Sequence, residues 1–272
     1  MSAPEWLAAE CATIAFCWRV ERVDGVAIGL TSHDRDLVFD GMVHRAAPGI
    51  SPSAIRRSDG LEADSMDVTG ALTHDAIAER DLLAGRWDGA GVTILAVDWT
   101  DPANRVELGR GTIGAIETAD GGFTAELRGA TAALDAPVAE LTSPECRAEL
   151  GDGRCRVAMA AGRRIVRIVA AEGNRLTVDA AEPVADAYGS GRLRWLDGAN
   201  SGMAAAIDRS AGADMTLRLP PRLPVRPGDR VELIQGCDKR LETCVARFAN
   251  AANFRGEPFL PGIDLLTRYP GA

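Results

Sequence analysis

The sequence has few lysines, histidines and aromatic residues, and its acidity excludes one class of ligand. Lys239 is the only lysine among 272 residues, three residues are histidines, and 5% are aromatic. Arginine therefore supplies almost all the positive charge, a bias that a GC-rich genome explains without any function. The formal net charge is −9, so the chain lacks the clustered positive charge that tight binding of DNA or RNA requires.

Long apolar runs and targeting segments are also missing. No stretch reaches the roughly 18 apolar residues of a membrane span. The first residues, MSAPEWLAAECATIAF, have neither a basic start nor a clear cleavage site, so they do not form a signal peptide. We therefore expect folding in a reducing cytosol. Disulfides are rare there, and the six cysteines favour metal ligation or burial.

Familiar catalytic motifs are absent too. The sequence contains no HExxH, no GxSxG and no Walker loop. A GxGxxG match at 109–114 lies in a strand-like segment and opens no helix, so we interpret it as chance. His33–Asp36 has the composition of a solvated turn, and His44 and His74 are isolated. We therefore expect a protein that is not an enzyme.

The first half of the chain is predicted to be a β-rich α+β domain, residues 1–145. Asp-Gly pairs at 24–25 and 40–41 separate alternating apolar runs, which is a strong hairpin signal. Three further strands follow from 92 to 131, the first of them central. One helix is predicted at Asp75–Ala84, with Asp75 as its N-cap and Gly85 ending it. A short helix broken by prolines 137 and 144 comes next.

The second half is predicted to hold a small inserted β domain between two cysteine-bearing segments. Residues 146–160 form the first segment, 161–232 a small barrel or sandwich of short strands, and 233–272 the second segment. Four prolines keep residues 219–228 out of any ladder interior. A helix is predicted at Leu241–Ala252, followed by a loop with Phe254, Phe259 and Leu260 as packing anchors. The predicted fold class is mainly β (α+β), with a C-terminal Cys-bearing helix.

Four cysteines occur as two pairs in these segments. Eight residues separate Cys146 from Cys155, and six separate Cys237 from Cys244. We interpret the four as one site closed across the chain, with nearby arginines, Lys239 and backbone N–H groups offsetting the thiolate charge. These spacings do not decide between structural zinc and an iron–sulfur cluster, and plain burial is a third interpretation. Cys11 and Cys17 are expected to be ordinary core residues.

Two long segments carry a resemblance to a known family. GCDKRLETCVARFANAANFRGEPFLPG and CRAELGDGRCRV resemble signatures of the tail-tip hub proteins of siphophages and gene transfer agents. LTSHDRDLVFDG, ALTHDAIAERDLLAGRWDGA and VDWTDP are similar to N-terminal signatures of the same family, so the resemblance spans nearly the whole chain. Glu257 departs from the pattern, because an aromatic is expected there. That departure leaves the packing of its loop open.

The resemblance implies a structural hub protein stabilised by a [4Fe-4S] cluster. Its ligands would be Cys146, Cys155, Cys237 and Cys244; a Zn(Cys)4 site or a cluster-dependent redox enzyme are the alternatives. It also implies a homotrimer between a distal tail protein ring and a central tip or receptor-binding protein. DNA would pass only in transit, and any cell-wall peptidase would be a neighbouring protein. The expected location is the tail tip of a virion-like particle that is assembled in the bacterial cytoplasm and released extracellularly.

Overall fold

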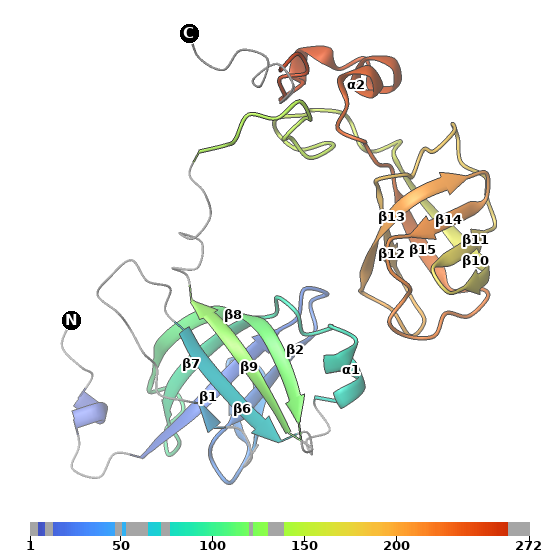
Figure 1. Cartoon of the computed structure of the whole chain (residues 1–272). Helices are drawn as coiled ribbons and strands as arrows, with labels where there is room; N and C mark the ends of the chain where they lie inside the picture. Colours follow the sequence, from blue (N-terminus) through green and yellow to red (C-terminus); the bar gives the residue numbers. More distant parts are fainter. Residues whose placement is uncertain are drawn as a thin grey trace. The chain divides into compact units, whose positions relative to one another are not determined.

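The chain folds into two compact units, Met1–Val138 and Ala139–Ala272. The computed structural model describes residues 5–8, 13–46, 51–52, 65–71, 77–119, 122–129 and 139–260. The first unit holds a nine-stranded sheet, and the second holds a closed six-stranded barrel and a short helix (Figure 1). The predicted mainly β fold class is confirmed. Among the described residues, no helix is long and apolar enough to cross a membrane.

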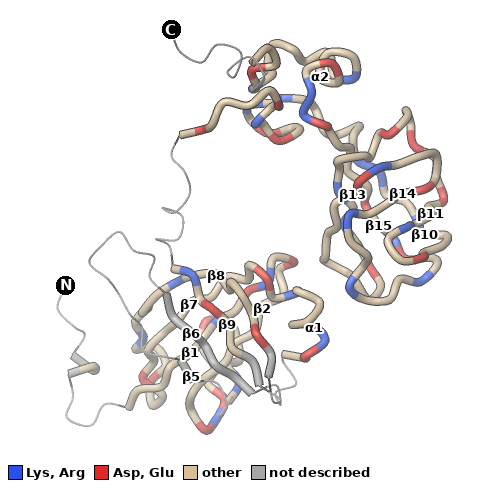
Figure 2. Tube along the Cα trace, viewed as in Figure 1, with Lys and Arg blue, Asp and Glu red and all other residues tan. Residues whose placement is uncertain are grey.

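The net negative charge of the chain is concentrated in the first unit. Residues 1–138 contain 22 Asp and Glu against 11 Arg, a net charge of −11. Residues 139–272 contain 17 Asp and Glu against 19 Arg and Lys, a net charge of +2. Figure 2 shows the described part of these charges along each unit. The two units therefore present different electrostatic surfaces to any partner.

The sheet of the first unit has the order β3-β4-β2-β1-β7-β8-β9-β6-β5. Among the described pairs, β2 and β4 run parallel and the others antiparallel. β7 pairs with both β1 and β8, as expected of a central strand. The strands are β1 Ile14–Glu21, β2 Ala27–Thr31, β3 Leu37–Phe39, β4 Met42–Ala46, β5 Ser51–Pro52, β6 Ser65–Ala71, β7 Gly91–Asp98, β8 Arg105–Ala119 and β9 Gly122–Gly129. A 3-10 helix, Glu5–Ala8, precedes them.

Both predicted hairpins form at their Asp-Gly pairs. Gly25 has a φ of +88° between β1 and β2. Between β3 and β4, Asp40 and Gly41 have φ values of +51° and +69°. A two-residue hairpin turn of this kind needs positive φ at both central residues, which Asp-Gly adopts readily.

The helix of the first unit is shorter than predicted. α1 spans Glu79–Leu83, and its N-cap is Ala78, which makes no side-chain cap bond. The predicted cap, Asp75, lies outside the described residues. Gly85 follows the helix with a φ of +72°, so the predicted C-terminal stop is confirmed. Leu82 is the buried residue through which α1 packs on the core.

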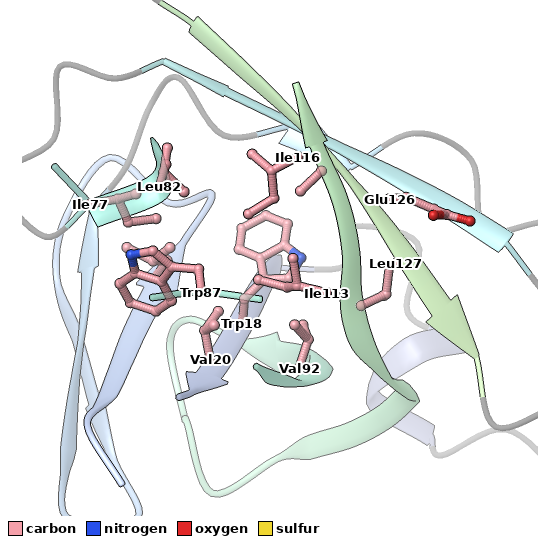
Figure 3. Close-up of a pocket in the computed structure, with 12 residues that line it drawn as sticks. Trp18, Val20, Ile77, Leu82, Trp87, Val92, Ile113, Ile116, Glu126 and Leu127 are labelled. Atoms are coloured by element: carbon pink, nitrogen blue, oxygen red, sulfur yellow. The ribbon is translucent and has the colours of Figure 1, made fainter. Parts of the chain in front are cut away.

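The sheet buries an apolar core on each face. On one face, Trp18 and Trp87 pack with Leu82 around a cavity of about 40 Å³ (Figure 3). On the other face lie Ala15, Cys17, Leu37, Phe39 and Val97. Cys17 is fully buried, and its sulfur lies 3.3 Å from the Thr31 hydroxyl. Core packing is therefore confirmed for Cys17, whereas Cys11 lies outside the described residues.

The inserted domain of the second unit is a closed barrel in the order β10-β11-β14-β13-β12-β15. Because its strands close into a ring, this domain is a barrel and not a sandwich, the two forms that the sequence allowed. Its core includes Trp195, Met215 and Leu233, all almost completely buried. No strand occurs between Leu217 and Arg230, in line with the four prolines of that loop. The strands are β10 Arg163–Glu172, β11 Arg175–Val178, β12 Arg192–Trp195, β13 Ala204–Ala211, β14 Asp214–Leu217 and β15 Arg230–Ile234.

Three predictions for the described part of the second unit need correction. α2 spans Leu241–Phe248 and ends four residues before the predicted Ala252, because Ala249 takes a left-handed conformation with a φ of +46°. A 3-10 turn, Ala251–Asn253, follows it. The described part of the predicted Pro-broken helix, 139–145, is not helical. Phe259 is 89% exposed, so it is no packing anchor among the described residues.

Candidate metal centre

The barrel brings the two cysteine-bearing segments together. Its first and last strands, β10 and β15, pair antiparallel, with Arg163 opposite Ile234. The Gln235 amide donates to the Gly162 carbonyl at 2.8 Å, just beyond that pair. The chain therefore enters and leaves the barrel at one place. As a result, the residues before Gly162 and those after Gln235 lie side by side, although about 70 residues of barrel separate them.

Backbone and lysine contacts join the two segments directly. The Cys146 amide donates to the Lys239 carbonyl at 2.8 Å. The Lys239 ammonium donates to the Ala148 carbonyl at 2.6 Å and lies 3.1 Å from the Glu149 carboxylate. Lys239, the one lysine of the chain, thus connects the loop after Cys237 to the segment after Cys146. The ammonium group of Lys239 is therefore directed at the Ala148 carbonyl and the Glu149 carboxylate.

The end of α2 connects Cys244 to Cys155. Asn250 donates its backbone N–H to the Cys244 carbonyl at 3.1 Å. Its side-chain Nδ2 donates to the Cys155 carbonyl at 2.7 Å and lies 3.7 Å from the Cys155 sulfur. Five residues later in the chain, the backbone amide of Arg255 donates to the Cys146 sulfur at 3.4 Å. Two of the four sulfurs therefore receive an N–H group from the residues that follow α2.

All four cysteines are free thiols that interact electrostatically with one another. None forms a disulfide. Burial raises the pKa of the Cys244 thiol, and the charges of the other three cysteines raise it further. Burial also raises the pKa of Cys237, while the backbone N–H and the charge of Lys239 lower it, as expected of a nearby cation; the charge of Cys146 raises it slightly. Cys244 is thus within electrostatic range of the other three thiols, and the negative charge of any thiolates among them would be stabilised by a bound cation.

The four thiols differ in access to solvent. Cys155 and Cys244 are buried, while Cys146 and Cys237 are partly exposed. A groove of about 420 Å³ runs beside Cys237, between the cysteine segments and the barrel edge formed by Ser190–Arg192 and Ala204–Ala206. Within the described residues, no three His, Cys, Asp or Glu side chains are arranged to hold a single metal ion.

Arg147 and Arg154, beside two of the cysteines, bind carboxylates. Their offset of thiolate charge stays a prediction. Arg147 binds Glu257 through both carboxylate oxygens, at 2.6 and 2.8 Å, and Glu140 at 3.1 Å. Arg154 pairs with the same Glu140 and donates to the Arg147 carbonyl at 2.9 Å. Arg147, Arg154, Glu140 and Glu257 thus form a network of ion pairs beside the cysteines. The sulfurs themselves are contacted by N–H groups.

Sequence reasoning assigned no role at the site to Glu140, Glu257 or Asn250. The signal for Glu257 was its departure from the aromatic expected there, which places a carboxylate in a loop near the cysteines. Its side chain also accepts from the Ser143 amide at 3.0 Å. The loop that the departure left open is therefore fixed by an ion pair and a hydrogen bond.

Left-handed backbone occurs at three non-glycine residues of the cysteine segments. Arg156 follows Cys155 with a φ of +62°, Lys239 follows Asp238 with +65°, and Ala249 ends α2 with +46°. Each costs about 1–2 kcal/mol relative to a right-handed conformation. Such strained residues concentrate at functional sites, where the surrounding structure holds them in place. The strain here lies in turns beside the cysteines.

The other sequence candidates do not form a second site. His33 lies in a turn, as expected, with its ring 5.1 Å from that of Trp99. His44 is buried and stacks on Phe39 with ring centroids 3.9 Å apart. Burial lowers the pKa of His44. His74 lies outside the described residues. The chemistry that the described residues offer is therefore concentrated at the four thiols.

Comparisons with known proteins agree with this organisation. Residues 2–158 match the family "Baseplate hub protein, N-terminal attachment domain", and residues 186–264 match "Phage conserved hypothetical protein BR0599". No curated protein matches the chain. A chain of the structure "Virion of native gene transfer agent (GTA) particle" is 38% identical, with a TM-score of 0.86, over 98% of this chain and 94% of that one. The chain belongs to the family of phage and gene transfer agent baseplate hub proteins.

Proposed function

We propose that this protein is the hub of a phage-like tail tip, joining a distal tail protein ring to a central tip or receptor-binding protein as a homotrimer. The family match to an attachment domain and the similarity to a chain of a particle support a structural role in a tail complex. The observation that carries the proposal is the match over nearly the whole chain to a chain of a gene transfer agent particle, together with the two-unit organisation of an acidic β unit followed by a barrel. The hub would be assembled in the cytoplasm and released with the particle.

The four thiols would hold a [4Fe-4S] cluster as the rigid element of this hub. Cys146, Cys155, Cys237 and Cys244 are a complete donor set for such a cluster, and N–H groups contact two of their sulfurs. When bound, the cluster supplies a crosslink between segments about 80 residues apart. A crosslink over such a loop removes roughly 4 kcal/mol of unfolded-state entropy in the logarithmic model.

Zinc bound by the same four cysteines is the competing occupant. A tetrahedral zinc site with Zn–S bonds of about 2.3 Å requires four sulfurs in mutual contact. The cysteine spacings of eight and six residues differ from the tight Cys-x2–4-Cys knuckles usual for structural zinc, which favours the cluster. Metal and sulfide analysis of the purified chain distinguishes the two occupants.

The acidic first unit would line the path of DNA through the tail. Its net charge of −11 repels phosphates, so DNA would pass without being retained. Attachment to the tail ring would use the same unit, which lies within the match to an N-terminal attachment domain. Any enzyme that opens the cell wall would then be a neighbouring protein.

Particle assembly with single cysteine variants tests the proposal. Cys237→Ser and Cys146→Ser are expected to abolish or strongly reduce intact tails, seen by electron microscopy of purified particles, and to lower the number of infective or gene-transferring particles. Cys17→Ser is the matched control, because Cys17 belongs to a core cluster of the first unit and the four cysteines belong to the second unit. Normal tails from both site variants, with normal amounts of the hub in each, would refute the proposed structural centre.

A further inference from the structure

Asn250 is the residue through which the turn after α2 contacts the first cysteine segment. One side-chain N–H group bridges the carbonyl and the sulfur of Cys155, at 2.7 and 3.7 Å. The opposite end of the amide is also used, because its Oδ1 accepts from the Asn253 side chain at 2.7 Å. The orientation of the amide, with nitrogen toward Cys155, is therefore fixed by both ends.

The backbone of the turn explains why this side chain points at a cysteine. Ala249 takes a left-handed conformation, and the Asn250 amide returns to the Cys244 carbonyl six residues earlier. The Ala249 amide donates to the Val245 carbonyl at 3.1 Å, which is the bond of the αL motif that ends a helix at a left-handed residue. The reversal brings residue 250 back beside the turn of Cys244. From there its side chain reaches Cys155 on the other segment.

Asn250 donates from its side chain to the Cys155 sulfur, whereas the contacts to Cys146 and Cys237 come from the backbone N–H groups of Arg255 and Lys239. The Cys155 loop does not depend on Asn250 for its shape. Asp152 accepts from the amides of Cys155, Arg154 and Glu149 at 2.6, 2.9 and 3.0 Å. Removing the Asn250 amide therefore changes the surroundings of the sulfur while the loop keeps its own bonds.

We propose that Asn250 is a positioning residue for the metal group, holding the Cys155 sulfur in place and tuning its electron density. This inference rests on the proposed cluster. An N–H group near a ligand sulfur draws negative charge from it, so the reduced, more negative state of a cluster is favoured and its reduction potential rises. The same contact restrains the rotation of the Cys155 side chain and slows the loss of this ligand.

Asn250→Asp is the variant that tests the role most directly. Aspartate keeps the shape of asparagine and can still accept from Asn253, but it lacks the N–H groups that face Cys155. Asn174→Asp is the matched control, because the Asn174 amide donates to the Leu217 carbonyl at 2.9 Å in the barrel and contacts no sulfur. Asn250→Ala is the neutral second variant, which separates loss of the N–H from addition of a charge.

The experiment uses the full chain, purified without oxygen, and measures iron release to a chelator and the midpoint potential by spectroelectrochemistry. Both Asn250 variants are expected to release iron about 10- to 100-fold faster than the wild type, the usual effect of removing an outer contact to a metal ligand. Their midpoint potentials should shift to more negative values. Asn174→Asp should match the wild type, and circular dichroism should show the same barrel in all four proteins.

Each outcome separates this inference from the proposed cluster. An iron-loaded wild type whose release rate and potential are unchanged by both Asn250 substitutions would overturn the positioning role and leave the cluster standing. A wild type that holds neither iron nor sulfide nor zinc would overturn both. If the wild type holds zinc, the cluster fails, and unchanged zinc release from the Asn250 variants would then overturn the positioning role as well.

Discussion

The guanidinium of Arg147 binds both carboxylate oxygens of Glu257, at 2.6 and 2.8 Å, across 110 residues of sequence. Arg147 directly follows Cys146, and Glu257 lies in the loop after α2, so the pair ties together the two segments that carry the four thiols. Arg147 is the main reason that the pKa of Glu257 falls to about 2. A two-pronged contact of this kind is stronger and more directional than a single-pronged ion pair.

Exchanging these two charges tests the ion pair. Arg147→Ala and Glu257→Ala should each lower the Tm of the second unit by several degrees and speed iron release, because the segments lose a direct connection. The double variant Arg147→Glu, Glu257→Arg should recover part of that loss in thermal unfolding followed by circular dichroism. If the Tm loss of the double variant equals the summed Tm losses of the two single Ala variants, the ion pair does not hold the segments together.

Ala249→Gly should stabilise the second unit. Ala249 has a φ of +46° at the end of α2, where an alanine costs about 1–2 kcal/mol and a glycine pays no steric cost. The greater flexibility of glycine in the unfolded chain offsets part of this, leaving a gain of about 0.5–1 kcal/mol. Urea unfolding measures it. Ala251→Gly is the control, since Ala251 has no positive φ and should lose stability; equal losses in both variants would contradict the argument.

Sequence reasoning predicted what local chemistry determines. The Asp-Gly hairpins, the central strand of the first unit, the Gly85 stop and the inserted barrel all follow from turn residues and apolar alternation. Helix boundaries were less certain. Asp75 and Ala252 were chosen from residue type, whereas the structure starts α1 at Glu79 and ends α2 at Phe248, where a left-handed alanine intervenes. Alanine carries no sequence signal for that conformation, because glycine is the residue normally found there.

The cysteine site was predictable as a group of residues but not as an arrangement. Cysteine pairs and the family resemblance singled out the four residues, and their role as ligands stays a prediction. The contacts between the segments arise from the pairing of β10 with β15, which no local pattern encodes. The partners of Arg147 were unpredictable for the same reason, because Glu140 precedes the first cysteine segment and Glu257 lies in the loop after α2.

Filling the cavity of the first unit should stabilise it. Val92 lines the cavity of about 40 Å³ beneath Trp18 and Trp87. Val92→Ile adds one methylene group there, for a gain of up to about 0.8 kcal/mol in urea unfolding. Val97→Ile is the control, because Val97 is fully buried in the other core and does not line the cavity. Overpacking there should cost about 1–3 kcal/mol; a loss of that size in Val92→Ile would mean that the cavity does not exist.

The stability of the first unit should depend on pH through Asp98. The hydroxyls of Thr13 and Thr100 donate to it at 2.6 and 2.7 Å and hold its pKa at about 2. A carboxylate with a lowered folded-state pKa stabilises the fold above its unfolded pKa of about 3.9, and this contribution disappears as the pH falls toward 2. The Tm difference between wild type and Asp98→Asn should therefore be full at pH 5 and shrink between pH 4 and 2. A difference that does not change with pH would contradict the assignment.

The most direct measurement is an anaerobic absorbance spectrum of the purified full chain, with iron, sulfide and zinc counted on the same sample. The account predicts a brown protein with a broad visible band, about four iron and four sulfide per chain, as a [4Fe-4S] centre requires, and loss of both in Cys237→Ser but not in Cys17→Ser. A colourless protein carrying one zinc per chain, or no metal at all, would contradict it.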